Sequence, residues 1–327
     1  MYLVTGGAGF IGSNIAKTLS ENGHSVIIAD SLGTDNIKWK NISRTLLEGV
    51  IHPSDINSYL AKNPKLDGII HMGAISATTA VDGDEIVATN FKLSKDLWTF
   101  CALQKIPFIY ASSAATYGDG SHGFEDNNDL ETMKALRPLN LYGWSKQWFD
   151  LWALKQIKDG QPSPPQWAGL KFFNVYGPRE LHKEDMMSIV SKNYQLCAEG
   201  KLVKLFKSHH PDYDDGGQLR DFVYVADCVS VALWFLKQSG VNGIFNVGSG
   251  QARSFRDLIT AAFSAADKPP NIEYIPMPEK LRGKYQYYTQ ANLDSLRKAG
   301  YTEPMTTLED GVTDLLQSYL LTEYPQG

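Results

Sequence analysis

The sequence predicts an α/β protein, in which a doubly wound parallel sheet with helices on both faces is joined to a second, smaller α/β domain. Two observations predict this fold. Short apolar segments alternate with segments of helical periodicity through the first half of the chain, and such alternation is typical of a parallel sheet covered on both faces. A glycine cluster directly follows the first apolar segment, where a chain that passes from strand to helix needs a tight turn.

The composition and charge of the chain indicate which kinds of binding partner to expect. The length suggests about two domains of ~150 residues each, and the net charge of the 327 residues is -5. A chain of negative charge does not suit a phosphate backbone, so we expect no nucleic-acid partner. The sequence has neither a basic leader followed by an apolar run nor the ~18 apolar residues of a membrane span, so we expect a cytoplasmic protein without a membrane partner. Its three cysteines lack the spacing of metal ligands, and we expect no metal site.

The alternation places the elements along the chain. Residues 2–5 and 25–30 are apolar and flank residues 10–21, which have helical spacing, so the three segments form a βαβ unit. We expect further strands at 67–71, 106–111 and 169–173, and further helices at 84–104, 140–158 and 305–322. The pattern loosens beyond about residue 174, which predicts a first domain of residues 1–173 and a second formed mainly by 174–327, with segments near 220–250 returning to the first.

The glycine cluster has the spacing of a dinucleotide-binding loop. It lies between a strand and a helix, where small residues let the backbone approach a pyrophosphate held at the helix N-terminus. This context is more specific than the glycines alone, and it predicts an NAD(P)-binding Rossmann domain. We expect the cofactor to contact Gly6, Gly9, Phe10, Ile11 and Gly12.

Asp30 ends the second strand, 18 residues after Gly12. An acid at this position accepts a hydrogen bond from the adenosine ribose and favours NAD, because it would repel a 2′-phosphate. We assign Asp30 and the adjacent Ser31 to the cofactor site. Lys38, a few residues later, could instead reach a 2′-phosphate, so these residues leave the choice between NAD and NADP open.

Tyr142 and Lys146 lie four residues apart in the segment LYGWSK. This spacing puts both side chains on one face of a helix, where the ammonium of Lys146 would favour the ionised form of the Tyr142 phenol and make it an acid/base. The same spacing occurs by chance in many helices. Ser113, at the end of a predicted strand, adds a hydroxyl on the edge where ligands bind in doubly wound sheets.

The N-terminal glycine loop, Ser113, Tyr142 and Lys146 together resemble the extended short-chain dehydrogenase/reductase family. In that family the tyrosine is the acid/base, the lysine lowers its pKa and binds the nicotinamide ribose, and the serine positions the reacting hydroxyl. The resemblance therefore implies that Tyr142, Lys146 and Ser113 form a hydride-transfer site.

Within that family the chain is similar to the ADP-L-glycero-D-manno-heptose 6-epimerases. The segments that carry this similarity span nearly the whole chain: HMGAISATTAVDGD (71–84), IPFIYASSAATYG (106–118), KFFNVYGPRELHK (171–183), RDFVYVAD (220–227), GIFNVGSG (243–250) and LRGKYQYYTQANLDSLRKAGY (281–301). The similarity implies epimerisation at carbon 6 of ADP-heptose, in the synthesis of the lipopolysaccharide inner core. A tightly held NADP, or possibly NAD, would remove hydride to make a ketone and return it to the other face, so the reaction consumes no cofactor.

The similarity implies two acid/bases, one for each face of the reacting carbon, and it assigns one face to Tyr142 and the other to Lys183. By itself, Lys183 in a polar loop would be interpreted as a solvated charge. The similarity also implies a homo-oligomer, specifically a pentamer, and it assigns further contacts by position. Those to the cofactor are Met72, Gly73, Ala74, Ile75, Ser76, Asn90 and Lys146, and those to the nucleotide-sugar substrate are Ser113, Asn174, Lys183, Asp185, Lys192, Phe206, Arg220 and Tyr285.

The sequence departs from the family pattern in several places. Lys192 stands where a histidine is common, and Met72 and Ile75 stand where a glutamate and a cysteine are common. Glu184 and Asp185 stand where a glycine and a serine are common, which adds negative charge near a diphosphate and puts the contact at Asp185 in doubt. The loop SHHPDYDDGGQ (208–218) is longer than usual. Its histidines and acids lack ligand geometry, and we expect a loop that faces a phosphate or another subunit.

Three other functions remain open at this stage. A hexose 4-epimerase would share NVYGPR and RDFVYV, but it uses one tyrosine for both faces and has no need of Lys183. A related dehydratase usually carries an Asp-Glu pair where this chain has Ala114 and Ala115. A non-catalytic NAD(P)-binding sensor or scaffold commonly loses the tyrosine or the lysine, and this chain keeps both.

Overall fold

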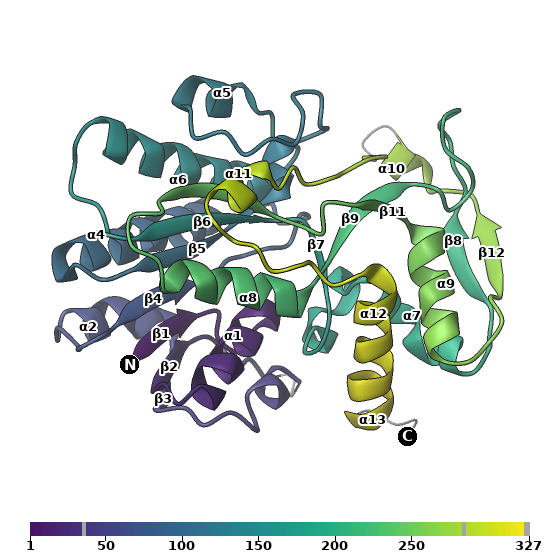
Figure 1. The fold of residues 1–327 in the computed structure, drawn as a ribbon, viewed down its shortest axis with the longest axis horizontal. Coiled ribbons are helices and arrows are strands. Elements are labelled where there is room, and N and C mark those ends of the chain that lie inside the picture. Colours follow the sequence, from purple (N-terminus) through teal and green to yellow (C-terminus); the bar gives the residue numbers. More distant parts are fainter. Residues whose placement is uncertain (35–36, 283–285, 324–327) are drawn as a thin grey trace.

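A computed structural model describes residues 1–34, 37–282 and 286–323. Its centre is a parallel sheet of seven strands in the order β10-β6-β5-β4-β1-β2-β3 (Figure 1). The strands are β1 (Tyr2–Thr5), β2 (Val26–Ala29), β3 (Gly49–Ile51), β4 (Gly68–His71), β5 (Phe108–Ser113), β6 (Trp167–Phe172) and β10 (Gly243–Val247). The chain moves outward from β1 in both directions, so the predicted doubly wound parallel sheet is confirmed.

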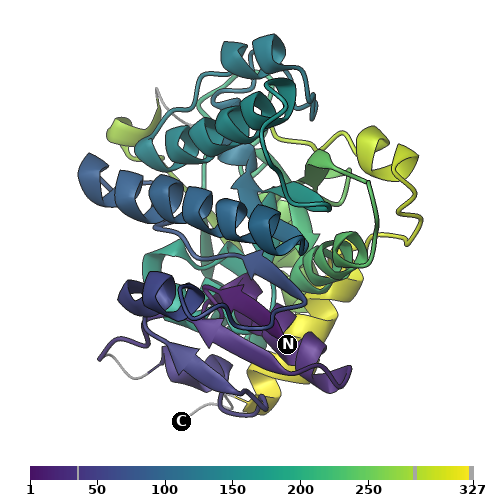
Figure 2. The ribbon, with the colours of Figure 1, turned by 90° about the vertical axis from the view of Figure 1, so that its left-hand side faces the viewer.

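Helices cover both faces of this sheet. On one face α1 (Phe10–Glu21) packs against α8 (Val225–Leu236), and their buried side chains share a core with those of β1, β2 and β6. On the other face α4 (Leu93–Gln104) and α6 (Leu141–Lys158) run side by side (Figure 2) and enclose an aromatic core around Trp98. The remaining short elements of this half are η1 (Lys38–Asn41), η2 (Pro53–Asp55), α2 (Ile56–Leu60), α3 (Gly83–Ile86), η4 (Ala114–Tyr117) and α5 (Leu130–Ala135).

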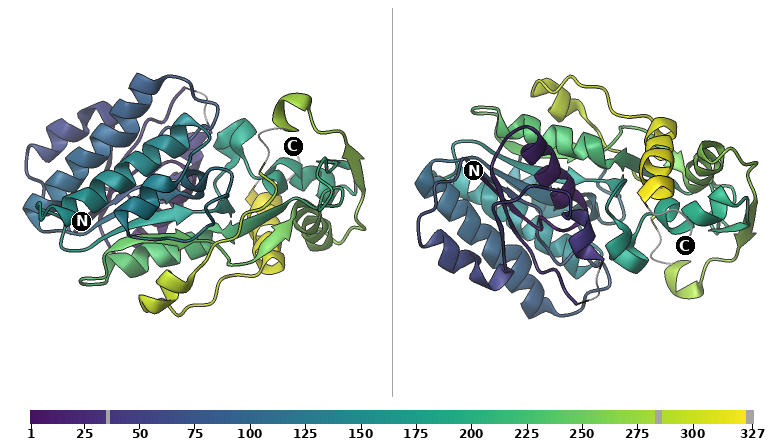
Figure 3. Two further views of the ribbon diagram at one scale, coloured as in Figure 1. Left: turned by 90° about the horizontal axis from the view of Figure 1, so that it is seen from above. Right: turned by 90° about the horizontal axis from the view of Figure 1, so that it is seen from below.

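Two smaller sheets lie at one end of the molecule (Figure 3). One contains β7 (Asn174–Tyr176), β9 (Leu219–Tyr224) and β11 (Ala252–Ser254), and the other pairs β8 (Val203–Phe206) with β12 (Ile272–Ile275). A third core joins them to α7 (Ile189–Ala198), α9 (Phe255–Ala265) and α12 (Leu308–Thr313). The other elements here are η5 (Leu181–Met186), α10 (Glu279–Arg282), α11 (Asp294–Lys298), the π-helical η6 (Asp314–Leu320) and α13 (Leu321–Glu323).

Close packing in the glycine cluster places the N-terminus of α1 at the carboxyl edge of the sheet. Gly6 has a φ of +63°, and a Cβ built on it would lie 2.7 Å from the backbone nitrogen of Gly73. A Cβ on Gly12 would lie 2.1 Å from the carbonyl oxygen of Gly6. Both contacts are closer than any side chain allows, so α1 begins in contact with the turn that follows β1.

Several elements differ from the predictions. β6 begins two residues earlier than predicted, and the helix predicted at 305–322 consists of α12, the π-helical η6 and α13. β5 begins two residues later than predicted, because Pro107 has no N–H to donate and the first ladder bond of the strand is from Phe108 to the Gln166 carbonyl. The strand continues through Ser112 and Ser113. The Ser112 hydroxyl donates a hydrogen bond to Asp150, and the Ser113 hydroxyl accepts one from the Ala115 amide. The helix predicted at 84–104 contains the π-helical segment η3 (Val87–Lys92) between α3 and α4, and segments of this kind are frequent at functional sites.

No helix within the described residues is long and apolar enough to cross a membrane.

Candidate active site

The parallel strands bring the predicted site residues to one edge of the sheet. Thr5 and His71 lie side by side at the ends of β1 and β4, and Tyr110 lies beside His71 on β5, three residues before that strand ends at Ser113. Consequently the glycine loop after β1, the segment from Met72 after β4, and Ser113 at the end of β5 all meet at this edge. The ligand crevice of a doubly wound sheet lies at the same place.

Tyr142 lies in the first turn of α6, which begins after Asn140. The Asn140 side chain caps the helix by accepting a hydrogen bond of 2.8 Å from the Gly143 amide. Burial raises the pKa of Tyr142, while a hydrogen bond with the Ser113 side chain lowers that pKa in part. Ser113 and Tyr142, predicted from different segments, are therefore in contact, as a serine that orients the reacting hydroxyl requires.

Lys146 is almost completely buried, with 4% of its surface exposed. Its ammonium lies 6.0 Å from the centre of the Tyr142 ring. Burial lowers the pKa of Lys146 to about 8, and the negative charge of Asp150 limits the decrease. No described residue accepts a hydrogen bond from this ammonium, so its donors suit the hydroxyl groups of a ligand such as the nicotinamide ribose.

The N-terminus of α1 suits a pyrophosphate. Gly9 is the N-cap residue, and no side chain caps the helix. The amides at Phe10, Ile11 and Gly12 therefore remain available to an anion, as the first amides of a helix do. The dinucleotide cofactor thus fits both the loop and the buried Lys146.

Asp30 and Lys38, the two residues that bear on cofactor choice, form an ion pair of 2.5 Å. The Asp30 carboxylate also accepts hydrogen bonds from the Ala8 amide at 2.9 Å and the Ser31 amide at 2.8 Å. Because Lys38 compensates the charge of Asp30, the pair does not repel a phosphate as an isolated carboxylate would.

Asn90 connects the segment after β4 to α6. Its side-chain oxygen accepts a hydrogen bond from the Ile75 amide at 2.8 Å, and its nitrogen donates to the Ile75 carbonyl at 3.0 Å and to the Ser145 hydroxyl at 3.0 Å. Met72 to Ser76, predicted as cofactor contacts, are therefore held next to the residue that precedes Lys146. The side-chain amide of Asn90, which was predicted to contact the cofactor, forms its hydrogen bonds with other protein groups.

Lys183 lies in η5, with its ammonium 5.2 Å from the centre of the Phe10 ring. Burial lowers the pKa of Lys183, and the nearby Glu180 carboxylate opposes that decrease. The lysine is thus half-buried against the first residue of α1 and is not a solvated charge. Its neighbour His182 accepts a hydrogen bond of 3.0 Å at Nδ1 from the Asn41 side-chain amide. Burial lowers the His182 pKa to about 4, so the imidazole is neutral at pH 7.

Glu180, which the sequence analysis missed, holds the Lys183 segment in place. Its buried carboxylate accepts hydrogen bonds from the Gly177 amide at 3.3 Å, from the Ser188 amide and hydroxyl at 2.7 and 2.6 Å, and from the Ser191 hydroxyl at 2.6 Å. These donors lie on both sides of Lys183 in the chain. A glutamate in a polar loop has no sequence signal that distinguishes it from a solvated acid.

The predicted substrate contacts lie mainly on the smaller sheets. Asn174 is exposed at the start of β7, and Phe206 ends β8. Arg220 is largely buried on β9, with its guanidinium 5.7 Å from the centre of the Phe255 ring. Lys192 donates to the Asp185 carbonyl at 2.6 Å, which brings these two predicted residues together. Tyr285 lies outside the described residues.

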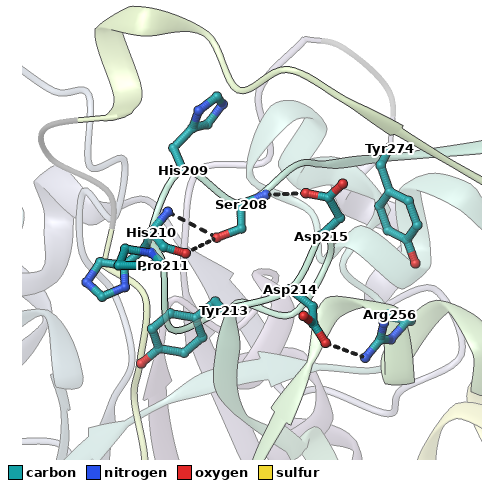
Figure 4. Close-up of a pocket in the computed structure, with 9 residues that line it drawn as sticks. All are labelled: Ser208, His209, His210, Pro211, Tyr213, Asp214, Asp215, Arg256 and Tyr274. Atoms are coloured by element: carbon teal, nitrogen blue, oxygen red, sulfur yellow. Dashed lines mark hydrogen bonds and ion pairs between the residues drawn. The ribbon is translucent and has the colours of Figure 1, made fainter.

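A shallow pocket of about 660 Å³ lies in the predicted long loop (Figure 4), and Tyr142 is not among the residues that line it. Ser208 closes the loop through its amide, which donates to Asp215 at 2.9 Å, and Asp214 faces Arg256 at 4.0 Å. The residues that line the pocket are Ser208, His209, His210, Pro211, Tyr213, Asp214, Asp215, Arg256 and Tyr274. Within the described parts of the chain, no three His, Cys, Asp or Glu side chains are placed to hold a metal ion.

Sequence comparison connects this site to a known family. The profile of the NAD dependent epimerase/dehydratase family matches residues 2–248, three quarters of the chain. The chain belongs to this family. Membership confirms the predicted nicotinamide cofactor, and it agrees with the serine, tyrosine and lysine found together at the sheet edge.

Individual relatives of the family are similar over the full length. The ADP-L-glycero-D-manno-heptose-6-epimerase of Nitratidesulfovibrio vulgaris (strain DP4) is 49% identical over 99% of both chains. The crystal structure of the Helicobacter pylori ADP-L-glycero-D-manno-heptose-6-epimerase is 30% identical, with a TM-score of 0.76 over 96% of this chain and 94% of that one. The resemblance predicted from the six segments is therefore confirmed.

Another member of the fold is similar in structure but more distant in sequence. The UDP-N-acetylglucosamine 4-epimerase of Methanobrevibacter ruminantium M1 has a TM-score of 0.80 over 98% of both chains, with 20% identity. At this identity the similarity describes the fold alone.

Replacing Glu180 should destabilise the protein. Glu180→Ala leaves the Gly177 amide and the two serines without their buried acceptor, which costs about 1–3 kcal/mol of unfolding free energy. Denaturant unfolding measures the loss. The exposed Glu131, replaced by Ala as a control, should change that free energy by no more than about 0.5 kcal/mol. If both substitutions change the free energy of unfolding by the same small amount, Glu180 does not hold the Lys183 segment in place.

Proposed function

We propose that this chain is an isomerase that converts ADP-D-glycero-D-manno-heptose to ADP-L-glycero-D-manno-heptose at carbon 6. The observation that carries the proposal is the position of Lys183, a second basic group half-buried against Phe10 at the glycine loop. A chain with Ser113 and Tyr142 already has one acid/base, and a second is needed only where protons are exchanged on both faces of a carbon. The names of its full-length relatives support the nucleotide-sugar substrate.

Each side chain of the site has a separate role in the proposed reaction. The bound nicotinamide cofactor supplies the removal and return of hydride at carbon 6. Tyr142 takes the hydroxyl proton on one face, with Ser113 holding that hydroxyl, and Lys183 exchanges the proton on the opposite face. The ammonium of Lys146 lowers the cost of forming the Tyr142 phenolate. Because the substrate is oxidised and then reduced again, no cofactor is consumed.

The Asp30–Lys38 ion pair supports NADP as the cofactor of this chain. Lys38 compensates Asp30 and also donates to the Ser31 carbonyl at 2.9 Å, so its ammonium lies where the adenosine ribose would be bound. A 2′-phosphate there would meet a positive charge. NAD, without this phosphate, would use only the ribose hydroxyls and Asp30.

Other parts of the proposal concern the setting of the reaction. We propose that residues 1–173 bind the cofactor and 174–327 mainly the substrate, with the segment near 220–250 returning to the first unit, which the positions of α8 and β10 support. The family resemblance supports a cytoplasmic homo-oligomer, specifically a pentamer, in lipopolysaccharide inner-core synthesis. Neither a nucleic acid nor a membrane is a proposed partner.

The substrate is tested by direct conversion. The purified protein is incubated with ADP-D-glycero-β-D-manno-heptose without added cofactor, and the two carbon-6 epimers are resolved by chromatography. We expect a mixture of both epimers, since the bound cofactor is regenerated in each cycle. No conversion by protein that carries its cofactor would contradict the proposal.

Replacing Lys183 tests the second acid/base. Lys183→Met should slow epimerisation by about 10²–10⁴-fold, the usual contribution of an acid/base, without loss of bound cofactor. Tyr142→Phe should have an effect of similar size. Lys201→Met, which removes an exposed lysine paired with Glu199, serves as the control. Normal turnover by Lys183→Met would mean that Tyr142 serves both faces, as in a hexose 4-epimerase.

Replacing Lys38 tests the choice of cofactor. Lys38→Glu should weaken NADP by about tenfold or more, since a charged hydrogen bond contributes about 1.5–3 kcal/mol, and should weaken NAD much less. Fluorescence titration of the reduced cofactors measures both affinities, with Lys40→Glu as the neighbouring control. Equal weakening of the two cofactors would exclude a contact between Lys38 and the 2′-phosphate.

A further inference from the structure

A buried ion pair lies beneath the proposed catalytic residues. Asp150 and Lys171 have no exposed side-chain surface, and the ammonium of Lys171 lies 3.3 Å from the Asp150 carboxylate. Asp150 belongs to α6, four residues after Lys146 and therefore one turn further along the same helical face. Lys171 belongs to β6, which pairs with the strand that ends at Ser113.

The carboxylate of Asp150 connects α6 to β5. It accepts hydrogen bonds from the Tyr110 phenol at 2.9 Å and from the Ser112 hydroxyl at 2.6 Å. Ser113, the next residue along β5, forms the side-chain hydrogen bond with Tyr142. The strand end that carries the proposed catalytic serine is thus attached to the helix that carries the tyrosine at two successive residues.

Stability alone does not account for the pair. Removing two charges from water is costly, and apolar side chains of similar volume in their place are often equally stable or more stable. The pair also has partners that fix its geometry: Lys171 donates to the Thr116 hydroxyl at 2.5 Å, and its ammonium lies 4.7 Å from the centre of the Tyr117 ring.

We propose that Asp150 is a positioning residue of the active site, which keeps Lys146 in its charged form and aligns Ser113 with Tyr142. This inference rests on the proposed function only in assigning the chemistry to Tyr142 and Lys146. Asp150 touches neither substrate nor cofactor in this account and acts through its neighbours.

The charges around Asp150 support the first part of this role. Lys146 and Tyr142 face it from α6, Tyr110 from β5 and Lys171 from β6. Asp126, in the loop before α5, faces Lys171, Tyr117 faces both acids, and His71 on β4 faces Lys146. Burial and the charge of Lys146 lower the pKa of His71 to about 3, so this histidine is neutral at pH 7. The negative charge of Asp150 therefore favours the protonated form of Lys146.

The test follows the pH dependence of kcat in the protein with its bound cofactor. If turnover needs charged Lys146, activity falls as pH rises through the Lys146 pKa. Loss of the Asp150 charge lowers that pKa, so in Asp150→Asn the alkaline limb should move to lower pH by about one unit. Asp159→Asn, at the exposed end of the same helix, is the matched control and should leave the limb in place.

A double variant separates this role from a structural one. Asp150→Asn alone leaves the buried Lys171 without its carboxylate partner, which should also lower Tm. Asp150→Asn combined with Lys171→Met removes both charges, and we expect Tm to recover while the alkaline limb stays shifted. A limb that returns to the wild-type pH together with Tm would overturn the proposal and leave Asp150 a structural residue.

A titration that needs no turnover distinguishes failure of this inference from failure of the proposed function. The lysine ε-carbons of the ¹³C-labelled holoenzyme are followed by NMR, with the Lys146 signal assigned by its loss in Lys146→Met. We expect its midpoint at lower pH in the double variant. A shifted midpoint without conversion of ADP-heptose would reject the substrate and keep the role of Asp150, and an unshifted midpoint would reject that role whatever the substrate.

Discussion

The common direction of the seven strands is the constraint on which the site depends. Because all of them point the same way, the glycine loop after β1, the segment after β4 and Ser113 on β5 are delivered to one edge. Helix α6 then adds Tyr142 and Lys146 from one face of the sheet. The contact of Gly6 with Gly73 sets how closely the first two segments approach, and a side chain at Gly6 would separate them.

Buried polar and charged side chains hold the groups at this edge in position. Asp150 attaches α6 to β5 and β6, Asn90 attaches the segment after β4 to α6, and Glu180 attaches the Lys183 segment to α7. Each is a polar group whose burial is favourable only with its hydrogen bonds complete. The site therefore depends on these supporting groups, since the loss of one leaves its own buried hydrogen-bond partners unsatisfied.

Much of the fold could be predicted from local patterns. Apolar runs and helical spacing predicted β1, α1 and α6 almost to the residue, and the glycine spacing predicted the turn at Gly6. Ser113 and Tyr142 were predicted from separate segments and lie in contact. Glu180, Asp150 and Lys171 could not be predicted, because charged residues have the same one-letter pattern whether they are solvated or buried, and their partners are distant in sequence. The π-helical turn at Asn90 likewise depends on a tertiary contact with Ile75.

The central claim is that two bases serve opposite faces of carbon 6. The most direct measurement is a pair of crystal structures of the cofactor-bound protein, one with each epimer of ADP-glycero-manno-heptose. The account predicts that the carbon-6 hydroxyl of one epimer lies about 3 Å from the Tyr142 phenol and that of the other about 3 Å from the Lys183 ammonium, within hydrogen-bond reach. If both hydroxyls meet Tyr142 while Lys183 stays against Phe10, the two-base account is wrong.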